Sequence, residues 1–209
     1  MMFEYRNVGV EGVEKLLWIT KDSGAFGSKN SGPLGDWIQG KQYFLKYVKN
    51  KVTVLQAGGN CGMYPLFYSK YFENVITFEP DDNNFHCLKE NCKNIPNIQY
   101  IQGGLGNVNS KLSLEIGPEY NVGMHTIKNE PGNVQMYKID DLKLENLDLL
   151  HLDIEGYETE ALQGAKETIK KYSPVIITER SHGFDVIEGL GYSPVEILQM
   201  DTVFIREFY

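Results

Sequence analysis

Residues 52–62 read Val52-Thr-Val-Leu-Gln-Ala-Gly-Gly-Asn-Cys-Gly62, a short apolar run followed at once by closely spaced glycines. The β-branched residues of this run suit a buried strand. Gly58, Gly59 and Gly62 allow the backbone to turn sharply and to approach a ligand without an intervening Cβ. The helix-like segment 63–72 follows directly, so its N-terminal amides would face the turn. The pattern predicts a nucleotide-binding turn, although an isolated glycine cluster is also common in ordinary strand-to-helix loops.

A second strand-like run, residues 75–79, ends in Phe78-Glu79-Pro80. Glu79 follows Gly58 by about 20 positions, the offset at which a carboxylate accepts both hydroxyls of an adenosine ribose. Taken alone, Glu79 could equally end a surface strand, with Pro80 stopping the ladder. The order of strand, glycine turn, helix, strand and acid favours the nucleotide site.

The length of 209 residues accommodates one α/β domain, but not a dinucleotide domain with a substantial substrate domain. A formal net charge of −8 argues against a broad phosphate-backbone footprint. We therefore expect no nucleic acid among the partners.

The chain has three cysteines, Cys61, Cys87 and Cys92, in neither a disulfide framework nor a usual metal-ligand spacing. This indicates a reducing compartment and no metal site. The N-terminus lacks a charged start followed by an apolar stretch, and no run is long enough to span a bilayer. We expect a soluble, cytoplasmic protein without membrane contact.

Residues 1–50 read as an N-terminal arm or lid, followed by the main domain over residues 51–209. Residues 15–20 suit a strand, residues 23–40 form a glycine-rich loop, and residues 42–50 suit a helix that leads into the core. An ordered surface wrap or an oligomer contact is the alternative explanation of the glycine-rich arm, and it is the commoner one for such arms. A homo-oligomer therefore stays open.

Strands and helices alternate after Glu79. Residues 82–94 form an amphipathic helix with acids at its start, and residues 97–102 form a strand that ends at Gly103. Residues 107–138 interrupt this alternation and are predicted to form a β-hairpin insertion. The insertion either shapes a substrate pocket or is a β-ribbon without a functional role.

Residues 147–154 are apolar enough for a central strand with both faces buried. An acidic turn and a helix follow, then a strand over 174–179, a short helix over 184–190, and a closing hairpin of residues 192–198 and 202–207. The sequence thus predicts a doubly wound α/β sheet of about seven strands with a C-terminal antiparallel hairpin. This arrangement is more typical of an S-adenosylmethionine (SAM) methyltransferase than of a dinucleotide dehydrogenase.

Five short motifs then point to one family. They are Gly58-Gly-Asn-Cys-Gly62, Phe78-Glu-Pro80, Lys138-Ile-Asp-Asp-Leu142, Asp153-Ile-Glu-Gly-Tyr-Glu158 and Ala161-Leu-Gln-Gly-Ala165. Over residues 52–180 this set closely resembles the FkbM family of methyltransferases. The resemblance implies a class I methyltransferase (Rossmann-like) fold, SAM as methyl donor, and a hydroxyl of a saccharide or other small molecule as acceptor.

The resemblance also implies a cofactor site. Gly58, Asn60 and Gly62 would line the methionine portion, Glu79 would hold the ribose, and Asp153 would lie beneath the methionine amine or near the transfer point. The implied set is Gln56, Gly58, Gly59, Asn60, Gly62, Glu79, Pro80, Gln102, Gly103 and Asp153, with Gln102 and Gly103 beside the adenine.

The chain departs from the family pattern at two positions. Gln56 stands where the family usually has an aspartate, which removes a negative charge near a cationic cofactor. His151 stands where a lysine is frequent.

Methyl transfer to oxygen is an in-line displacement, so positioning carries much of the catalysis and a base adds a smaller factor. The candidate catalytic residues are Asp153, Glu155, His182 and His151. Three of the four have a plainer alternative: His151 as a hydrogen-bonded core residue, His182 as a surface residue, and Glu155, like Glu158, as part of a solvated helix start.

Two other functions remain open from the sequence. An NAD-linked oxidoreductase would use Gly58, Gly62 and Glu79 in the same way, but it leaves the acidic turn at 153–158 unexplained. A methyltransferase-like fold without catalysis, serving as a binding module, is favoured mainly by Gln56.

Overall fold

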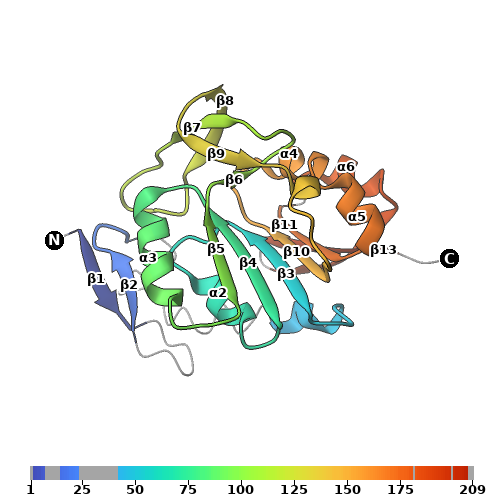
Figure 1. Ribbon diagram of the computed structural model, residues 1–209, viewed down its shortest axis with the longest axis horizontal. Helices are drawn as coiled ribbons and strands as arrows, with labels where there is room; N and C mark the ends of the chain where they lie inside the picture. Colours follow the sequence, from blue (N-terminus) through green and yellow to red (C-terminus); the bar gives the residue numbers. More distant parts are fainter. Residues whose placement is uncertain (1, 8–14, 24–41, 181, 199, 207–209) are drawn as a thin grey trace.

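A mixed sheet of seven strands forms the centre of the protein (Figure 1). The structure is a computed structural model, which describes residues 2–7, 15–23, 42–180, 182–198 and 200–206. The strand order is β12-β13-β11-β10-β3-β4-β5. The bounds are β3 Thr53–Ala57, β4 Asn74–Glu79, β5 Ile98–Gln102, β10 Leu149–Leu152, β11 Val175–Glu179, β12 Tyr192–Leu198 and β13 Asp201–Arg206. The five strands from β11 to β5 run parallel, and β13 runs antiparallel between β11 and β12. The predicted sheet and its closing hairpin are confirmed.

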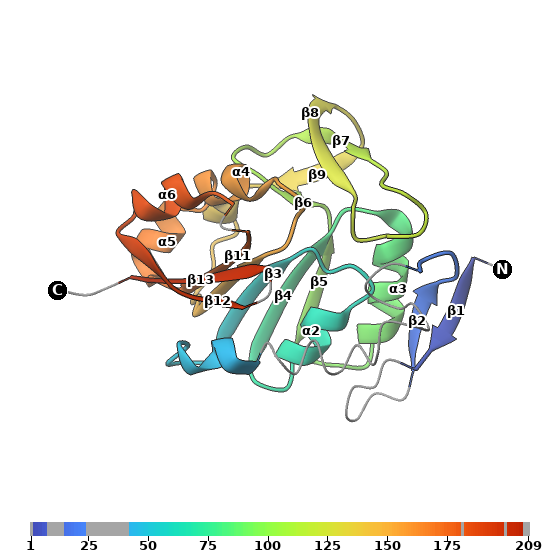
Figure 2. The same cartoon turned by 180° about the vertical axis from the view of Figure 1, so that it is seen from behind.

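Helices cover both faces of this sheet (Figures 1 and 2). One face packs against α2 Met63–Tyr68, α3 Asp82–Cys92 and the 3-10 helix η1 Gln42–Lys46, and the other against α4 Glu158–Gln163, α5 Lys166–Tyr172 and α6 Phe184–Glu188. A short 3-10 turn, η2 Ile139–Asp141, precedes β10. Both faces are covered, so every residue of β3 and β10 is buried, and β10 is apolar except for His151.

The chain reverses its direction of travel across the sheet between β3 and β10. It runs outward from β3 through β4 to β5 and then returns to β10, which pairs with the other side of β3. Ligands of such sheets bind beyond the carboxyl ends of the strands at this reversal. Gly58 follows β3 and Asp153 follows β10, and the Asp153 amide donates to the Ala57 carbonyl at 3.1 Å. The fold therefore places the glycine turn and the acidic turn side by side.

The predicted hairpin insertion is instead a sheet of four strands in the order β6-β9-β7-β8. The strands are β6 Gly104–Leu105, β7 Lys111–Glu115, β8 Thr126–Pro131 and β9 Val134–Tyr137. Strand β7 pairs with both β8 and β9, so the turn at residues 132–133 carries the chain from one side of β7 to the other. Figure 1 shows this small sheet beyond the end of β5. Strands β6 and β9 are too short to give a periodic signal in the sequence.

The described part of the N-terminal arm packs on the core. Strands β1 Phe3–Arg6 and β2 Leu16–Ile19 form an antiparallel pair, which confirms the strand predicted at 15–20. The Asn91 side chain of α3 bonds the amide and the carbonyl of Leu17 at 2.8 and 2.9 Å. The predicted helix at 42–50 is the shorter η1, with Phe44 and Leu45 buried. The glycine-rich segment 24–41 lies outside the described residues, so its role as a lid remains a prediction.

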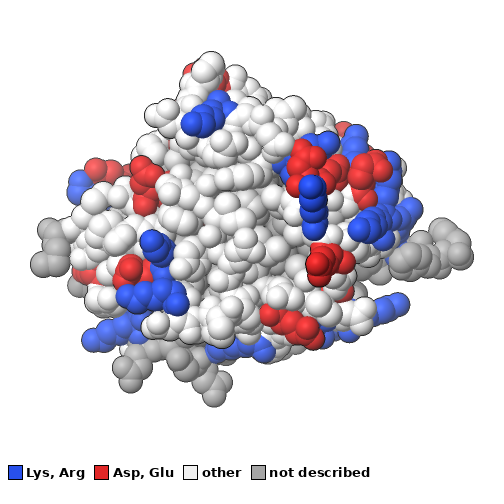
Figure 3. Space-filling view, in the orientation of Figure 1, with Lys and Arg blue, Asp and Glu red and all other residues white. Residues whose placement is uncertain are grey.

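Charged side chains of both signs alternate on the face seen in Figure 3, around a largely uncharged centre. In the described part of the chain, every helix falls short of the length and apolar character that crossing a bilayer requires.

Because β3 packs against β10, we expect the stability of the fold to be sensitive to any side chain at position 58. Its φ is 86°, and a Cβ there would lie 1.9 Å from the Asp153 carbonyl oxygen. Gly156 has a similar φ of 92°, but a Cβ there has nothing within 4 Å. We expect Gly156→Ala to lower the free energy of unfolding by about 1–2 kcal/mol, the cost of a left-handed backbone conformation alone. Gly58→Ala should lower it by clearly more, because its Cβ would also meet the Asp153 carbonyl oxygen. Equal losses in urea denaturation would show that the close contact is unimportant.

Candidate functional site

A cavity of about 320 Å³ opens at the carboxyl ends of the central strands. Glu79 lines it at the end of β4, Asp153 after β10, and Glu179 at the end of β11. Of the predicted site residues, those that line the cavity are Gly58, Gly59, Asn60, Glu79, Pro80, Gly103, Asp153 and Glu155. The structure therefore brings the two predicted carboxylates, Glu79 and Asp153, to one rim of the sheet.

The glycine turn is held by the neighbouring strand. The amides of Gly58 and Gly59 donate to the Phe78 carbonyl at 3.1 and 2.9 Å. A Cβ on Gly59 would lie 2.8 Å from the Thr77 hydroxyl oxygen. These glycines thus serve close packing between strand ends as well as open access to the cavity.

Glu79 is fixed against this turn although it is a carboxylate with only 4% of its surface exposed. One oxygen accepts from the Asn60 amide at 2.7 Å, and the other accepts from the Asp81 amide at 3.0 Å. Burial raises the pKa of Glu79 to about 7, although the two amides oppose the shift. Its charge therefore changes near neutral pH.

The insertion covers the Glu79 end of the cavity. The buried Asn84 side chain of α3 donates to the Val122 carbonyl at 2.8 Å, and both residues line the cavity. Met124 and Ile127 from the same segment also line it. The insertion therefore shapes the pocket, as one of the two sequence interpretations expected.

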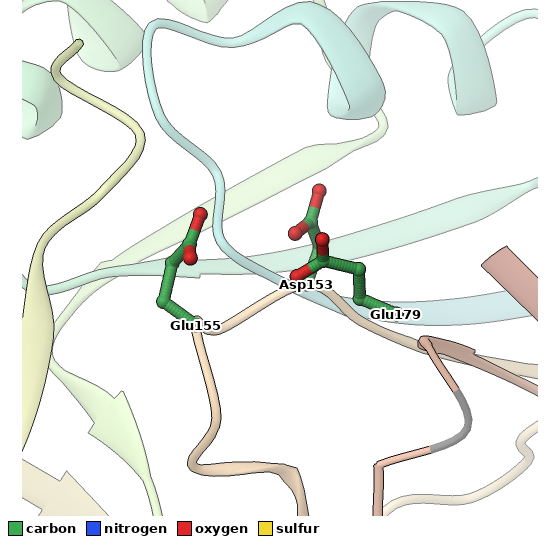
Figure 4. Close-up of side chains that lie close together, drawn as sticks. All are labelled: Asp153, Glu155 and Glu179. Atoms are coloured by element: carbon green, nitrogen blue, oxygen red, sulfur yellow. The ribbon is translucent and has the colours of Figure 1, made fainter. Parts of the chain in front are cut away.

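Three carboxylates gather at the other end of the cavity. Ligand oxygens of Asp153, Glu155 and Glu179 all lie within 4.8 Å of one another, and Figure 4 shows the side chains pointing into a common space. Burial raises the pKa of Glu155 to about 7, and the charges of Glu179 and Glu158 add to the shift. Glu155 can therefore accept a proton near neutral pH. The three carboxylates together can hold a cation such as an ammonium, a sulfonium or a divalent metal ion.

The acidic turn after β10 depends on Glu158, which is fully buried rather than part of a solvated helix start. One of its oxygens accepts from the Ile154 amide at 3.1 Å, and the other lies 3.1 Å from Nδ1 of His182. Glu158 is therefore a brace that holds the loop bearing Asp153 and Glu155 in shape.

Gln56 and Gly62 lie behind the cavity rather than along it. Gln56 has no exposed surface, and its amide nitrogen donates to the carbonyls of Ala57 and Gly58 at 3.0 and 2.9 Å. Its amide oxygen accepts from the Thr77 hydroxyl at 2.5 Å. An aspartate carboxylate could not donate to these carbonyls, so Gln56 strengthens the turn from within. Gly62 has a φ of 102° and ends the turn beside Cys92.

The two candidate histidines and Gln102 also lie outside the cavity lining. His151 is buried, with Nδ1 2.9 Å from the Tyr68 hydroxyl, as in the core interpretation. The half-exposed His182 pairs with Glu158. Gln102 is exposed and donates to Asp82 at 2.6 Å, in a separate shallow groove shared with the insertion.

Sequence reasoning missed several cavity residues. Glu179 and Asp201 both line the cavity, and they are directly paired across β11 and β13. The signal for Glu179 was the one used for Glu79, an acid at the carboxyl end of a parallel strand. Asp201 begins an antiparallel strand, so only its pairing with β11 brings it to the same rim. Tyr64, Asn84 and Arg180 also line the cavity without a distinctive motif.

Comparison with known proteins gives a consistent result. Residues 59–208 match the family described as Methyltransferase FkbM domain. Hexuronic acid methyltransferase AglP of Haloferax volcanii is 28% identical over 140 residues, covering 64% of this chain and 58% of that protein. Methyltransferase 1 of Beauveria bassiana is 27% identical over 143 residues, covering 53% and 57%. The chain thus spans less than two thirds of the length of these relatives.

Solved structures show the same fold. The methyltransferase FkbM from Methylobacillus flagellatus KT superposes with a TM-score of 0.52 at 18% identity, covering 74% of this chain and 43% of that one. A precorrin 8w decarboxylase from Methanobacterium thermoautotrophicum also gives 0.52, at 10% identity, covering 80% and 89%.

The sheet order, the closing antiparallel hairpin and the cavity at the strand reversal define a class I methyltransferase fold. The chain belongs to the FkbM family of SAM-dependent methyltransferases. The cavity fits SAM because it offers a buried carboxylate for ribose hydroxyls at one end and carboxylates for cationic groups at the other.

The bracing role of Glu158 predicts its effect on stability. Glu158→Ala leaves the Ile154 amide without its acceptor, and we expect a loss of about 1–3 kcal/mol in the free energy of unfolding. Glu160→Ala, at a partly exposed position of the same helix, is the control and should change it by no more than about 0.5 kcal/mol. Equal losses for the two variants in thermal or urea denaturation would rule out the brace.

Proposed function

We propose that this chain transfers a methyl group from SAM to a hydroxyl of a saccharide or similar small molecule. The observation that carries the proposal is the single cavity that joins Glu79 at the end of β4 to the carboxylates after β10 and β11. The hexuronic acid methyltransferase of Haloferax volcanii supports a saccharide as the acceptor class.

Different residues along the cavity bind different parts of SAM. Glu79 accepts hydrogen bonds from the ribose hydroxyls, and the backbone of Gly58 to Asn60 faces the methionine portion. Gly103, from the end of β5, flanks the adenine. Asp153 holds the methionine ammonium, which its position after β10 at the strand reversal favours.

Catalysis depends mainly on positioning. When bound, SAM supplies an electrophilic methyl group, and the chain must hold the acceptor hydroxyl in line with it. Glu155 receives the hydroxyl proton, because a pKa of about 7 suits a general base at neutral pH. His151 and His182 are weaker candidates because both lie outside the cavity lining.

The two other functions lose support. Family membership and the acidic end of the cavity leave an NAD-linked oxidoreductase without a favouring observation. The argument for a non-catalytic module rested on Gln56, whose bonds to the glycine turn give it a structural purpose instead.

Glu79→Ala should weaken SAM binding by about 1.5–3 kcal/mol, the value of hydrogen bonds to a charged group. The ribose hydroxyls donate to the ionised carboxylate, so wild-type affinity should rise as the pH rises through about 7 and the variant should lose this dependence. Glu73→Ala, exposed before the opposite end of β4, is the matched control. Isothermal titration measures all three proteins, and unchanged affinity in Glu79→Ala would refute the ribose assignment.

Glu155→Gln should lower kcat by roughly 10²–10⁴ and abolish the rise of kcat with pH around 7, because the amide cannot take a proton. Asp153→Asn should fold normally and lose turnover through weaker SAM positioning. The readout is formation of S-adenosylhomocysteine with a panel of glycosides. A wild-type protein that binds SAM but methylates no glycoside would contradict the proposed function, and wild-type rates in Glu155→Gln would remove Glu155 as base.

A further inference from the structure

His125 lines the cavity but has no role in the function proposed above. Of the four histidines, all of which lie in the described part of the chain, it is the one found in the cavity wall. It belongs to the loop between β7 and β8, directly before β8 begins, and it is partly buried. A residue so placed can contact both the protein and a ligand.

The loop that carries His125 covers the adenosyl half of the cavity. In Figures 1 and 2 the chain between β7 and β8 runs from the small sheet back toward the start of α3. Before His125, the Val122 carbonyl of this loop accepts from the Asn84 side chain of α3 at 2.8 Å. After His125, Cδ1 of Ile127 lies 3.8 Å from where a Cβ on Gly104 would be. His125 therefore lies in a segment held between α3 and β6, beside the strand ends assigned to ribose and adenine.

The backbone sets the tautomer of His125. The Gly117 amide donates to Nδ1 at 2.9 Å, so Nδ1 acts as an acceptor and carries no proton. Burial lowers the pKa of His125, although the charge of Asp81 opposes the shift, and the ring is therefore neutral at neutral pH. In a neutral ring whose Nδ1 accepts, the proton is on Nε2. His125 thus offers one hydrogen-bond donor, and it can take up a proton at Nδ1 only by losing the Gly117 bond.

Adenosine offers acceptors for this donor. The base has ring nitrogens with free lone pairs, and the ribose oxygens keep lone pairs after their hydroxyls donate to Glu79. A polar group left unpaired in a water-poor site is costly, so a donor fixed beside these atoms favours binding. We infer that His125 binds the adenosine of SAM by donating from Nε2 to a ring nitrogen of the base or to a ribose oxygen. The inference rests on the proposed function, because it takes this half of the cavity as the adenosine site.

Two substitutions that mimic opposite sides of the imidazole ring separate this role from a structural one. His125→Asn keeps an acceptor near the position of Nδ1 for the Gly117 amide, whereas His125→Gln keeps an amide donor near the position of Nε2. We expect His125→Asn to weaken binding of S-adenosylhomocysteine by about five- to thirtyfold, and His125→Gln to retain most of the affinity. His86→Asn, at an exposed histidine of α3, is the control and should bind as the wild type does.

The readout is isothermal titration, with unfolding midpoints measured in parallel. Wild-type affinity in His125→Asn would overturn the inference. An affinity in His125→Gln that is no higher than in His125→Asn would also overturn it, because a residue that serves only to hold Gly117 gives that order. Nitrogen NMR of the His125 ring at neutral pH should show the proton on Nε2, and a proton on Nδ1 would contradict the assignment.

Methylthioadenosine, which lacks the amino acid portion of the cofactor, tests where His125 acts. His125→Asn should weaken its binding by the same factor as that of S-adenosylhomocysteine, and a loss confined to S-adenosylhomocysteine would contradict a contact with adenosine. Analogues in which carbon replaces one ring nitrogen distinguish base from ribose. An analogue without the bonded nitrogen should be insensitive to His125→Asn, whereas a bond to the ribose leaves every analogue sensitive. A wild-type protein that binds no S-adenosylhomocysteine would instead refute the proposed function, so the two failures are distinguishable.

Discussion

The contact between the glycine turn after β3 and the backbone after β10 is the constraint on which the site depends. Gly58 sits so close to the Asp153 carbonyl that no side chain fits between them. This closeness brings the acidic turn onto the rim already occupied by Glu79, which the Asn60 amide holds against the same glycine turn. One glycine turn thus organises both ends of the cavity.

The second constraint is electrostatic. Burial disfavours ionisation of two carboxylates of the cavity, and it raises the pKa of Glu79 and of Glu155 from 4.5 to about 7. The raised pKa of Glu79 stabilises the folded protein below pH 4.5, and this stabilisation is lost as the pH rises through about 7. A ligand with a sulfonium, an ammonium and hydroxyl donors offsets this cost at neutral pH, so the cavity is arranged for a cationic cofactor.

Much of the fold was predictable because its signals are local. Residue type alone marks the ends of two strands, at the glycine turn and at Phe78-Glu79-Pro80. It also marks a whole strand, at the apolar run 147–154. The four-stranded insertion was not predictable, because β6 and β9 acquire their partners only through tertiary pairing. The same limit applies to the site: Asp201 reaches the cavity through antiparallel pairing, and the buried brace Glu158 looks like an ordinary acid at a helix start. Gln56 and His151 lie on the strands that lead into Gly58 and Asp153, but their side chains are enclosed by the core.

The most direct measurement is a crystal structure of the protein with S-adenosylhomocysteine. The account predicts ribose hydroxyls within about 2.6–3.2 Å of Glu79, the methionine amine beside Asp153, and the sulfur facing Glu155. An adenosyl group lodged elsewhere, for example in the groove beside Gln102 and Asp82, with Glu79 making no ligand contact, would contradict it.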